Sequence, residues 1–192
     1  MGHSVASRLA RIITVAIALT VLDCLIAAQE RPASPVKPIP EMQKLAELLE
    51  GDWQTTETME RSAEFPNRGS RQGRVHVSLA GRGESLHYEV HSDGSAGKLD
   101  GRLVISWEKD WATYGVWACF DPKHICHQRG TGHWEGDSFV NDYEQKTNGV
   151  KVRWRDTFNF SPTTYTLVAA MDTGNGHMKT QITTKATRAI EF

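Results

Sequence analysis

A group of cysteine and histidine residues near the middle of the sequence carries the side chains best suited to binding a metal ion. Cys119, His124, Cys126, His127 and His133 fall within 15 residues, and thiolate and imidazole groups are the usual zinc ligands. A tetrahedral site takes two separated pairs of ligands, whereas Cys126 and His127 are adjacent and point in opposite directions on a strand. The spacing therefore disfavours zinc, and we expect no metal and no other cofactor.

A disulfide is the chemistry that the two cysteines favour instead. The segment Phe120–Lys123 has the composition of a hairpin turn, which would place Cys119 opposite Cys126. Two cysteines in an oxidising compartment indicate one disulfide. We predict this Cys119–Cys126 bond, with free thiols as the alternative, and a loop this short should contribute about 2–3 kcal/mol of stability.

Three further histidines alternate along two neighbouring runs of strand-like sequence. His76, His87 and His91 occupy the polar positions of these runs, with Tyr88 and Glu89 beside them. Such a group could act in acid–base catalysis, but a solvated strand face is the commoner use of these residue types. No nucleophile elbow, phosphate loop or metalloprotease helix occurs in the sequence, so the residues do not predict an enzyme.

The composition describes one globular domain that does not bind nucleic acid. The chain has 192 residues, a formal charge of −1 and a hydrophobic content of 39% with six tryptophans. This length favours one domain, and the absence of a basic excess argues against a nucleic-acid partner. No repeat or coiled-coil pattern indicates an oligomeric state.

The first 28 residues have the features of a secretory signal peptide. Arg8 and Arg11 supply the positive charge, residues 12–26 are predominantly apolar, and small residues end at Ala28. The apolar stretch is too short for a stable membrane span. We expect cleavage after Ala28 and a periplasmic or secreted protein.

Two alternatives to cleavage remain open. The segment could stay as an uncleaved anchor, or Cys24 could carry a lipid, although Asp23 stands before it where a small residue is usual. Removal of the signal peptide also removes Cys24 and leaves Cys119 and Cys126 as the two cysteines of the mature chain.

Residues 29–40 and 40–50 lead into the predicted domain. Four prolines make residues 29–40 an extended tether. Apolar residues at helical spacing follow, Pro40 suits a first helical turn, and Gly51 ends the pattern. The sequence predicts one short amphipathic helix over residues 40–50, at the start of a domain that spans residues 41–192.

After Gly51 the apolar period changes from 3.6 to 2, which indicates β-strands. Asp93-Gly94, Asp100-Gly101 and Asn148-Gly149 are typical of hairpin turns. About nine or ten strands at this spacing predict an all-β sandwich or an up-and-down antiparallel barrel. The preceding helix favours the barrel, because it can cover one open end.

Barrels of this size can hold a small molecule inside. We predict a small apolar or amphipathic ligand in the interior, in contact with Trp107, Tyr114, Trp117 and Trp154. The alternative is an interaction module without a ligand, in which tryptophan side chains including Trp134 fill the barrel.

A basic ladder bears on the same question, because Lys151, Arg153 and Arg155 alternate with large apolar residues. If these cations faced inward, they would indicate an anionic ligand. If they faced outward, the large apolar residues would line the interior. The period of two leaves both orientations open.

The segment Leu45–Trp53 contains the pattern Leu-Leu-Glu-Gly-Asp-Trp directly after the predicted helix. It resembles the start of lipocalin-like, or calycin, barrels. Residues 41–189 as a whole resemble one bacterial family of that group, the domain of unknown function 1579. The stretches that support this are Leu79–Arg82, Gly132–Asp137 and Thr187-Arg188.

This resemblance implies structural roles for Gly51, Trp53 and Arg188. Trp53 is expected to plug the closed end of the barrel, with Arg188 across its ring as a cation–π partner. The family name carries no activity. The related nitrobindin-like barrels bind haem through a late-strand histidine, for which His177 is the candidate here, but Gln54–Glu57 replaces their glycine-rich run. Haem therefore stays an alternative to a ligand without metal.

Overall fold

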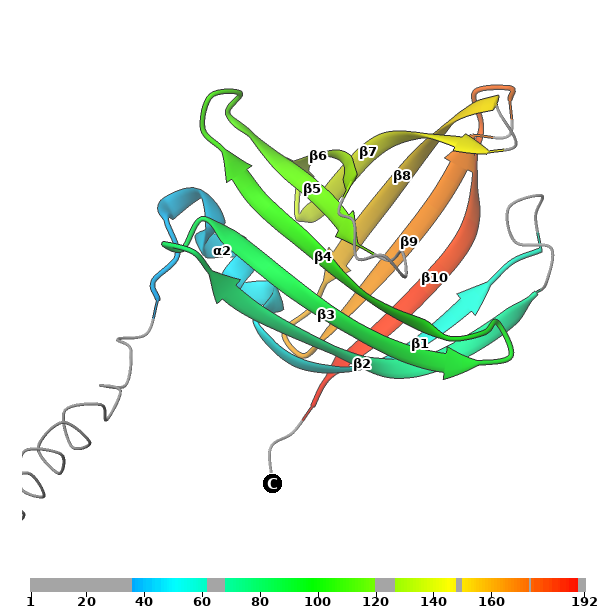
Figure 1. The fold of residues 1–192 in the computed structure, drawn as a ribbon, viewed down its shortest axis with the longest axis horizontal. Helices are drawn as coiled ribbons and strands as arrows, with labels where there is room; N and C mark the ends of the chain where they lie inside the picture. Colours follow the sequence, from blue (N-terminus) through cyan, green and yellow to red (C-terminus); the bar gives the residue numbers. More distant parts are fainter. Residues whose placement is uncertain (1–35, 62–67, 120–126, 148–149, 173, 190–192) are drawn as a thin grey trace, which may run out of the picture. The chain divides into compact units, whose positions relative to one another are not determined.

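The structure, a computed structural model, describes residues 36–61, 68–119, 127–147, 150–172 and 174–189. In this part of the chain one helix, α2 (Pro40–Leu49), precedes ten antiparallel strands (Figure 1). The strands are β1 (Gly51–Met59), β2 (Gly69–Ala80), β3 (Ser85–Gly94), β4 (Leu99–Glu108), β5 (Thr113–Cys119), β6 (His127–Glu135), β7 (Ser138–Thr147), β8 (Val150–Phe160), β9 (Thr164–Asp172) and β10 (Met178–Arg188).

The ten strands form a closed barrel. Each strand pairs antiparallel with the next in the sequence, and β1 pairs with β10 to complete the ring. The closing register runs from Trp53 opposite Arg188 to Met59 opposite Ile182. This confirms the predicted antiparallel up-and-down barrel with one short N-terminal helix, and closure removes the sheet edges that would otherwise invite aggregation.

The period of two along β8 shows how the sequence separates the inside of the barrel from the outside. Trp154 and Phe158 are buried, whereas Arg153 is exposed. Arg155 donates from Nε to Oδ1 of Asp142 at 2.8 Å on the outer face. The basic ladder of the sequence therefore faces water, and the large apolar residues face the interior.

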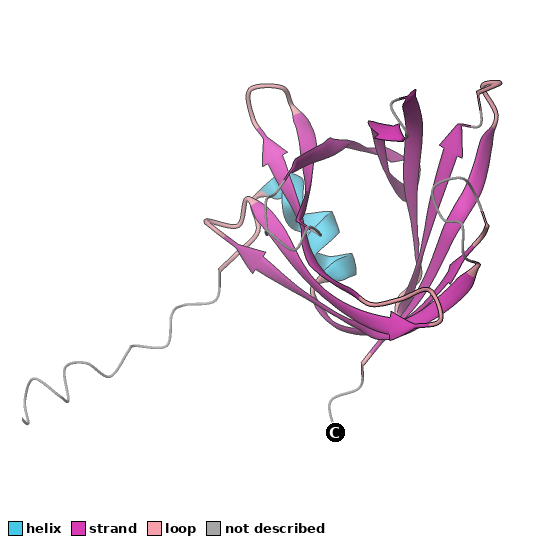
Figure 2. Ribbon diagram, turned by 45° about the vertical axis from the view of Figure 1, so that its right-hand side comes forward, coloured by secondary structure: helices cyan, strands magenta, loops and turns pink. Residues whose placement is uncertain are grey.

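The helix α2 covers one end of the barrel, and Figure 2 shows it within the outline of the ring. Pro40 stands in its first turn, where the missing N–H costs nothing. Met42, Leu45 and Leu49 have no exposed surface and belong to the main core cluster with Trp53. The Nε1–H of Trp53 donates to the carbonyl oxygen of Leu49 at 2.8 Å, which fixes the helix end to the first strand.

Arg188 joins the last strand to the same helix end. Its guanidinium lies 4.4 Å from the ring centre of Trp53, and it donates to the carbonyl oxygens of Glu50 and Leu48. Helix C-termini leave such carbonyls without intrahelical partners. Gly51 permits this contact, because it has φ +122° and a Cβ there would lie 2.8 Å from Nη1 of Arg188.

Aromatic side chains complete the closed end. The hydroxyl of Tyr114 donates to the carbonyl oxygen of Glu41 at 2.6 Å and accepts from Nε1 of Trp134 at 3.3 Å. Its ring meets those of Trp107 and Phe139 edge to face, with centroids 5.1 and 5.2 Å apart. The Tyr114 hydroxyl and the Nε1–H of Trp134 thus have partners in this largely buried cluster.

The predicted signal peptide (residues 1–28) and most of the tether (29–40) lie outside the described residues. Among the helices that the structure does describe, none is both long and apolar enough to span a bilayer.

Candidate ligand-binding cavity

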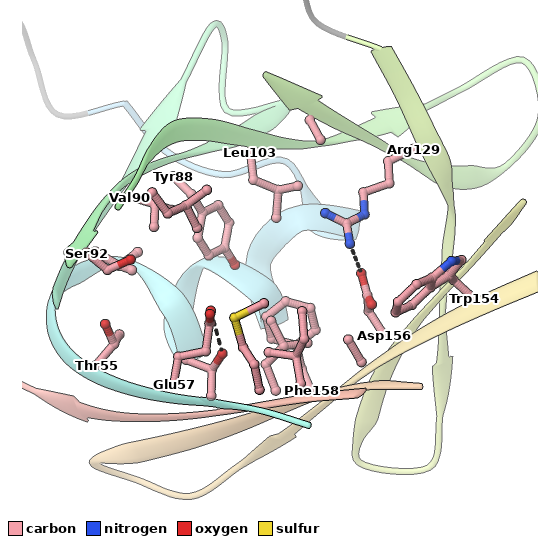
Figure 3. Close-up of a pocket in the computed structure, with 18 of the residues that line it drawn as sticks. Thr55, Glu57, Tyr88, Val90, Ser92, Leu103, Arg129, Trp154, Asp156 and Phe158 are labelled. Carbon is pink, nitrogen blue, oxygen red and sulfur yellow. Dashed lines mark hydrogen bonds and ion pairs between the residues drawn. The ribbon is translucent and has the colours of Figure 1, made fainter. Parts of the chain in front are cut away.

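The barrel holds a cavity of about 860 Å³ in the half away from α2 (Figure 3). Its apolar wall consists of Met59, Val75, Val90, Ala96, Leu99, Leu103, Ala118, Trp154, Phe158, Leu167, Ala169 and Ile182. Its polar lining consists of Thr55, Glu57, Arg71, Tyr88, Ser92, Arg129, Tyr143, Glu144, Gln145, Lys146, Asp156, Tyr165 and Thr184. The interior is therefore hollow and mixed in polarity, which is typical of a ligand pocket.

The four aromatic residues predicted to contact a ligand lie in different places. Trp154 lines the cavity and stacks on Tyr143, with an interplanar angle of 7°. Trp107 and Tyr114 belong to the aromatic cluster at the closed end. Trp117 pairs with Val104 and alternates with the lining residue Ala118 along β5, so its side chain stands on the other face of the strand.

The first of two ion pairs in the cavity joins the neighbouring strands β1 and β2. Glu57 and Arg71 are directly opposite in the register, and Arg71 donates from Nε to Oε1 of Glu57 at 2.8 Å. The two side chains are 15% and 9% exposed. The hydroxyl of Thr184 on β10 lies 3.5 Å from the other carboxylate oxygen, so three strands contribute to this group.

The second ion pair joins β6 to β8. Nη2 of Arg129 lies 3.5 Å from Oδ2 of Asp156 and also donates to the hydroxyl of Tyr143. Asn141 and Tyr143, both on β7, donate to the two oxygens of Asp156 at 3.4 Å. Figure 3 shows the guanidinium of Arg129 directed into the cavity with Asp156 beside it.

A β-bulge explains how Arg129 reaches the interior. Val116 pairs with Gly130 and Trp117 pairs with Gln128, so Arg129 is the extra residue that the ladder between β5 and β6 skips. Bulges redirect a side chain in this way and are common beside functional sites. Gly130 makes the close approach possible, because a Cβ there would collide with the backbone oxygen of Asp142.

Burial governs the protonation of the second pair. Burial raises the pKa of the Asp156 carboxyl above its usual range, and the nearby Arg129 opposes this rise. Burial also raises the pKa of Tyr143, which stays a neutral hydroxyl. For Arg129, burial acts to lower the pKa, but Asp156 and Tyr143 outweigh it and leave the pKa raised. The guanidinium is therefore the permanent charge at this site.

Some buried polar atoms in or next to the cavity have no hydrogen-bond partner among the described residues, namely the Tyr88 hydroxyl, Nε of Arg129 and Oδ1 of Asn141. Native proteins rarely leave such groups unsatisfied, and each costs free energy. Tyr88 is also buried, and burial raises the pKa of its hydroxyl well above the ordinary value.

None of the described lining residues of this cavity is a histidine. His76 and His91 are on the outer face, where each Nδ1 is within 2.9 Å of an aspartate, Asp52 and Asp100 respectively. They line a second depression of about 260 Å³ together with Asp52 and Glu89. A catalytic role for His76 or His91 would have to use this surface and not the interior.

His87 and His177 are exposed, and neither lines the cavity. His177, the haem candidate of the sequence, precedes β10 in an exposed turn. The interior surface that the described residues form is therefore free of imidazole.

The predicted cysteine chemistry falls partly outside the described residues. Cys119 is 4% exposed at the end of β5, but His124 and Cys126 are not described, nor is the side chain of His127. His133 is exposed and lies 3.0 Å from Glu135. No group of three potential metal ligands occurs among the described residues, and the disulfide stays a prediction.

Sequence reasoning missed the charged residues of the interior, although one of them left a signal. Along β8, Val152, Trp154, Phe158 and Phe160 form an apolar row at every second position, and Asp156 interrupts it. A carboxylate in a row that faces inward marks a buried polar site. The inward position of Arg129 had no such signal, because it depends on the bulge.

Comparison with known proteins agrees with the fold. No family model matches the chain, and no curated protein matches it. The S-type phycobiliprotein lyase CPES of Guillardia theta superposes with a TM-score of 0.51 at 12% identity, over 79% of this chain and 94% of that one. At this identity the likeness shows a shared fold and nothing more. Rv2717c of M. tuberculosis gives a TM-score of 0.46 at 11% identity, over 80% of this chain and all of the other.

Proposed function

We propose that this chain is an exported barrel that binds a small, partly apolar molecule in its interior. The observation that carries the proposal is the cavity of about 860 Å³. This volume lies within the range of roughly 300–1,000 Å³ that is typical of ligand pockets. The tryptophans of the alternative, filled barrel do not occupy this space, since Trp154 alone of Trp107, Trp117, Trp134 and Trp154 lines it.

The amino-terminal segment and the cysteines support the exported location that forms part of this proposal. A cleaved signal peptide over residues 1–28 would deliver the domain to the periplasm or outside the cell, where a Cys119–Cys126 disulfide could persist. Membership of the domain of unknown function 1579 family is part of the same proposal. The mass of the protein recovered from its producing cell tests the signal peptide and the disulfide. It reports the cleavage site and the loss of two hydrogens that a disulfide causes.

The similar Guillardia theta protein is named a phycobiliprotein lyase. At 12% identity this likeness concerns the fold, so we propose no lyase activity for the present chain. The cavity contains no histidine or cysteine among its described lining residues, and the proposal is one of binding.

Native mass spectrometry of the protein purified without denaturation tests the proposal. We expect an additional mass that disappears on unfolding, and we expect binding of the neutral fluorescent probe N-phenyl-1-naphthylamine. The matched variants are Ala118→Phe, which adds a ring to the cavity wall, and Trp111→Ala, which changes a side chain that is 71% exposed outside it.

Ala118→Phe should lose both the bound mass and the probe, and Trp111→Ala should retain them. If the wild-type protein binds neither a copurified molecule nor the probe, the proposal is wrong. The same holds if both variants bind as the wild type does while their circular dichroism shows an intact barrel.

A further inference from the structure

The charged groups among the described residues that line the cavity balance one another. Arg71, Arg129 and Lys146 are cationic, whereas Glu57, Glu144 and Asp156 are anionic, which makes three charges of each sign. Lys146 and Glu144 are exposed, so water and salt screen them. The charges that a bound molecule meets inside the barrel are thus the two internal pairs, Arg71–Glu57 and Arg129–Asp156.

Each internal pair presents a donor and an acceptor side by side. A guanidinium offers only N–H donors, and a carboxylate offers only acceptor lone pairs. The Arg129 side chain keeps 27% exposure and Asp156 keeps 10%, so both ions reach the cavity surface. Arg129 is the more accessible cation, because Arg71 keeps only 9%.

This arrangement disfavours guests that carry a net charge. An anion near Arg129 also approaches Asp156, and a cation near Asp156 also approaches Arg129. In a low-dielectric interior an uncompensated charge is costly. A pure hydrocarbon is also a poor guest, because it would remove water from both ion pairs without replacing its hydrogen bonds.

We infer that the ligand is an uncharged amphipathic molecule whose polar group places a hydrogen-bond acceptor next to a donor, as an amide or lactam does. The acceptor meets the guanidinium of Arg129 and the donor meets the carboxylate of Asp156. Its apolar part lies against the wall that includes Leu103 and Phe158. This inference rests on the proposed function, since it names the class of molecule that the same cavity takes.

A panel of three probes with one chain length and different polar groups tests the inference. Decanamide is neutral, decanoate is anionic and decylamine is cationic at pH 8, and each competes with N-phenyl-1-naphthylamine for the full-length mature protein. We expect decanamide to displace the probe about tenfold more tightly than either charged molecule, which corresponds to about 1.4 kcal/mol. Equal affinities, or tighter binding of decanoate or decylamine, would overturn the inference.

Asp156→Asn sharpens the test, because it keeps the shape of the side chain and removes its charge. Arg129 then lacks its counter-ion, so the affinity for decanoate should rise about tenfold while the affinity for decanamide does not. The control is Asp142→Asn, which removes the partner of Arg155 on the outer face and should leave the order of the three probes unchanged. If both variants behave alike, Asp156 does not set the preference and the inference fails.

Glu57→Gln provides an independent variant if Asp156→Asn does not fold. It should likewise raise the affinity for decanoate relative to the affinity for decanamide.

The proposed function and the proposed ligand class fail on different results. Failure of the fluorescent probe itself to bind contradicts a ligand-binding cavity. Binding of the probe without the preference for the amide contradicts only the class of ligand.

Discussion

The two ends of the barrel differ in how completely side chains fill them. At the end covered by α2, Trp53, Phe139 and Leu45 have 1% exposure or less, and the hydroxyl of Tyr114 has both a donor and an acceptor partner. The other half surrounds a cavity with ion pairs on its wall and the unpartnered Nε of Arg129. One end is a filled core, and the other is a lined space.

This difference indicates where the stability of the domain comes from. Apolar burial stabilises by about 25 cal/mol per Å², whereas a buried ion pair often adds nothing over apolar residues of the same volume. Natural sequences depart from good core packing at functional sites. The charged half is therefore the half that we assign to binding, and the closed end holds the fold together.

Trp53→Ala should have the largest effect and would weaken the closed end. The substitution removes a ring with 1% exposure, its hydrogen bond to Leu49 and its contact with Arg188. We expect the free energy of unfolding to fall by about 3–5 kcal/mol, measured by urea denaturation. Trp111→Ala, at a 71% exposed position, should change it by less than about 0.5 kcal/mol; a similar loss in both variants would contradict the division into two ends.

Asp156→Ala should have the next largest effect, in the open half. It leaves the guanidinium of Arg129 without a counter-ion, and we expect the free energy of unfolding to fall by about 1–3 kcal/mol. A fully enclosed pair would cost more, but the Arg129 side chain keeps 27% exposure. Asp142→Ala breaks an outer pair with Arg155 and should cost at most about 1 kcal/mol. Thermal unfolding of the two variants compares them directly, and an equal cost would show that the interior pair is as hydrated as the outer one.

Tyr114→Phe removes one hydroxyl, and with it two hydrogen bonds, at the closed end. The ring contacts with Trp107 and Phe139 remain, and only the bonds to Glu41 and from Trp134 are lost. We expect the free energy of unfolding to fall by about 0.5–1.5 kcal/mol and the amide hydrogens of α2 to exchange faster. Unchanged exchange in the helix would mean that this hydroxyl does not fasten it to the barrel.

The smallest effect concerns pH. The pKa of Asp156 is raised in the folded protein, chiefly by burial. The protonated carboxyl therefore contributes stability below its unfolded pKa of about 3.9, and this contribution is lost as the pH rises through the higher folded pKa. Across this window the stability of the wild type should fall relative to that of Asp156→Asn; urea denaturation at a series of pH values would contradict this if the difference stayed constant.

The pattern of residue types predicted the elements well and the interior poorly. The helix expected over residues 40–50 ends at Leu49, and the strands follow the period of two because one face of each is buried. The period cannot tell which face is inside, and the outward position of Lys151, Arg153 and Arg155 emerges only once the ring closes.

The candidate site depends on geometry that no short stretch of sequence contains. Glu57 and Arg71 are 14 positions apart and meet through the register of β1 and β2. Arg129 enters the cavity through a bulge, which shifts the inward face by one residue. Trp107 and Tyr114 are inward-facing aromatics as expected from their strands, but their distance along the barrel places them in the filled end.

The pairing of β1 with β10 also has a consequence for the order in which the chain folds. All other strand pairs join neighbours in the sequence, whereas Trp53 meets Arg188 across nearly the whole domain. Closing this long loop costs more chain entropy than closing any of the hairpins, and non-local pairings slow folding. We therefore expect the hairpins to form first and the Trp53–Arg188 contact to appear last, as the rate-limiting closure of the ring.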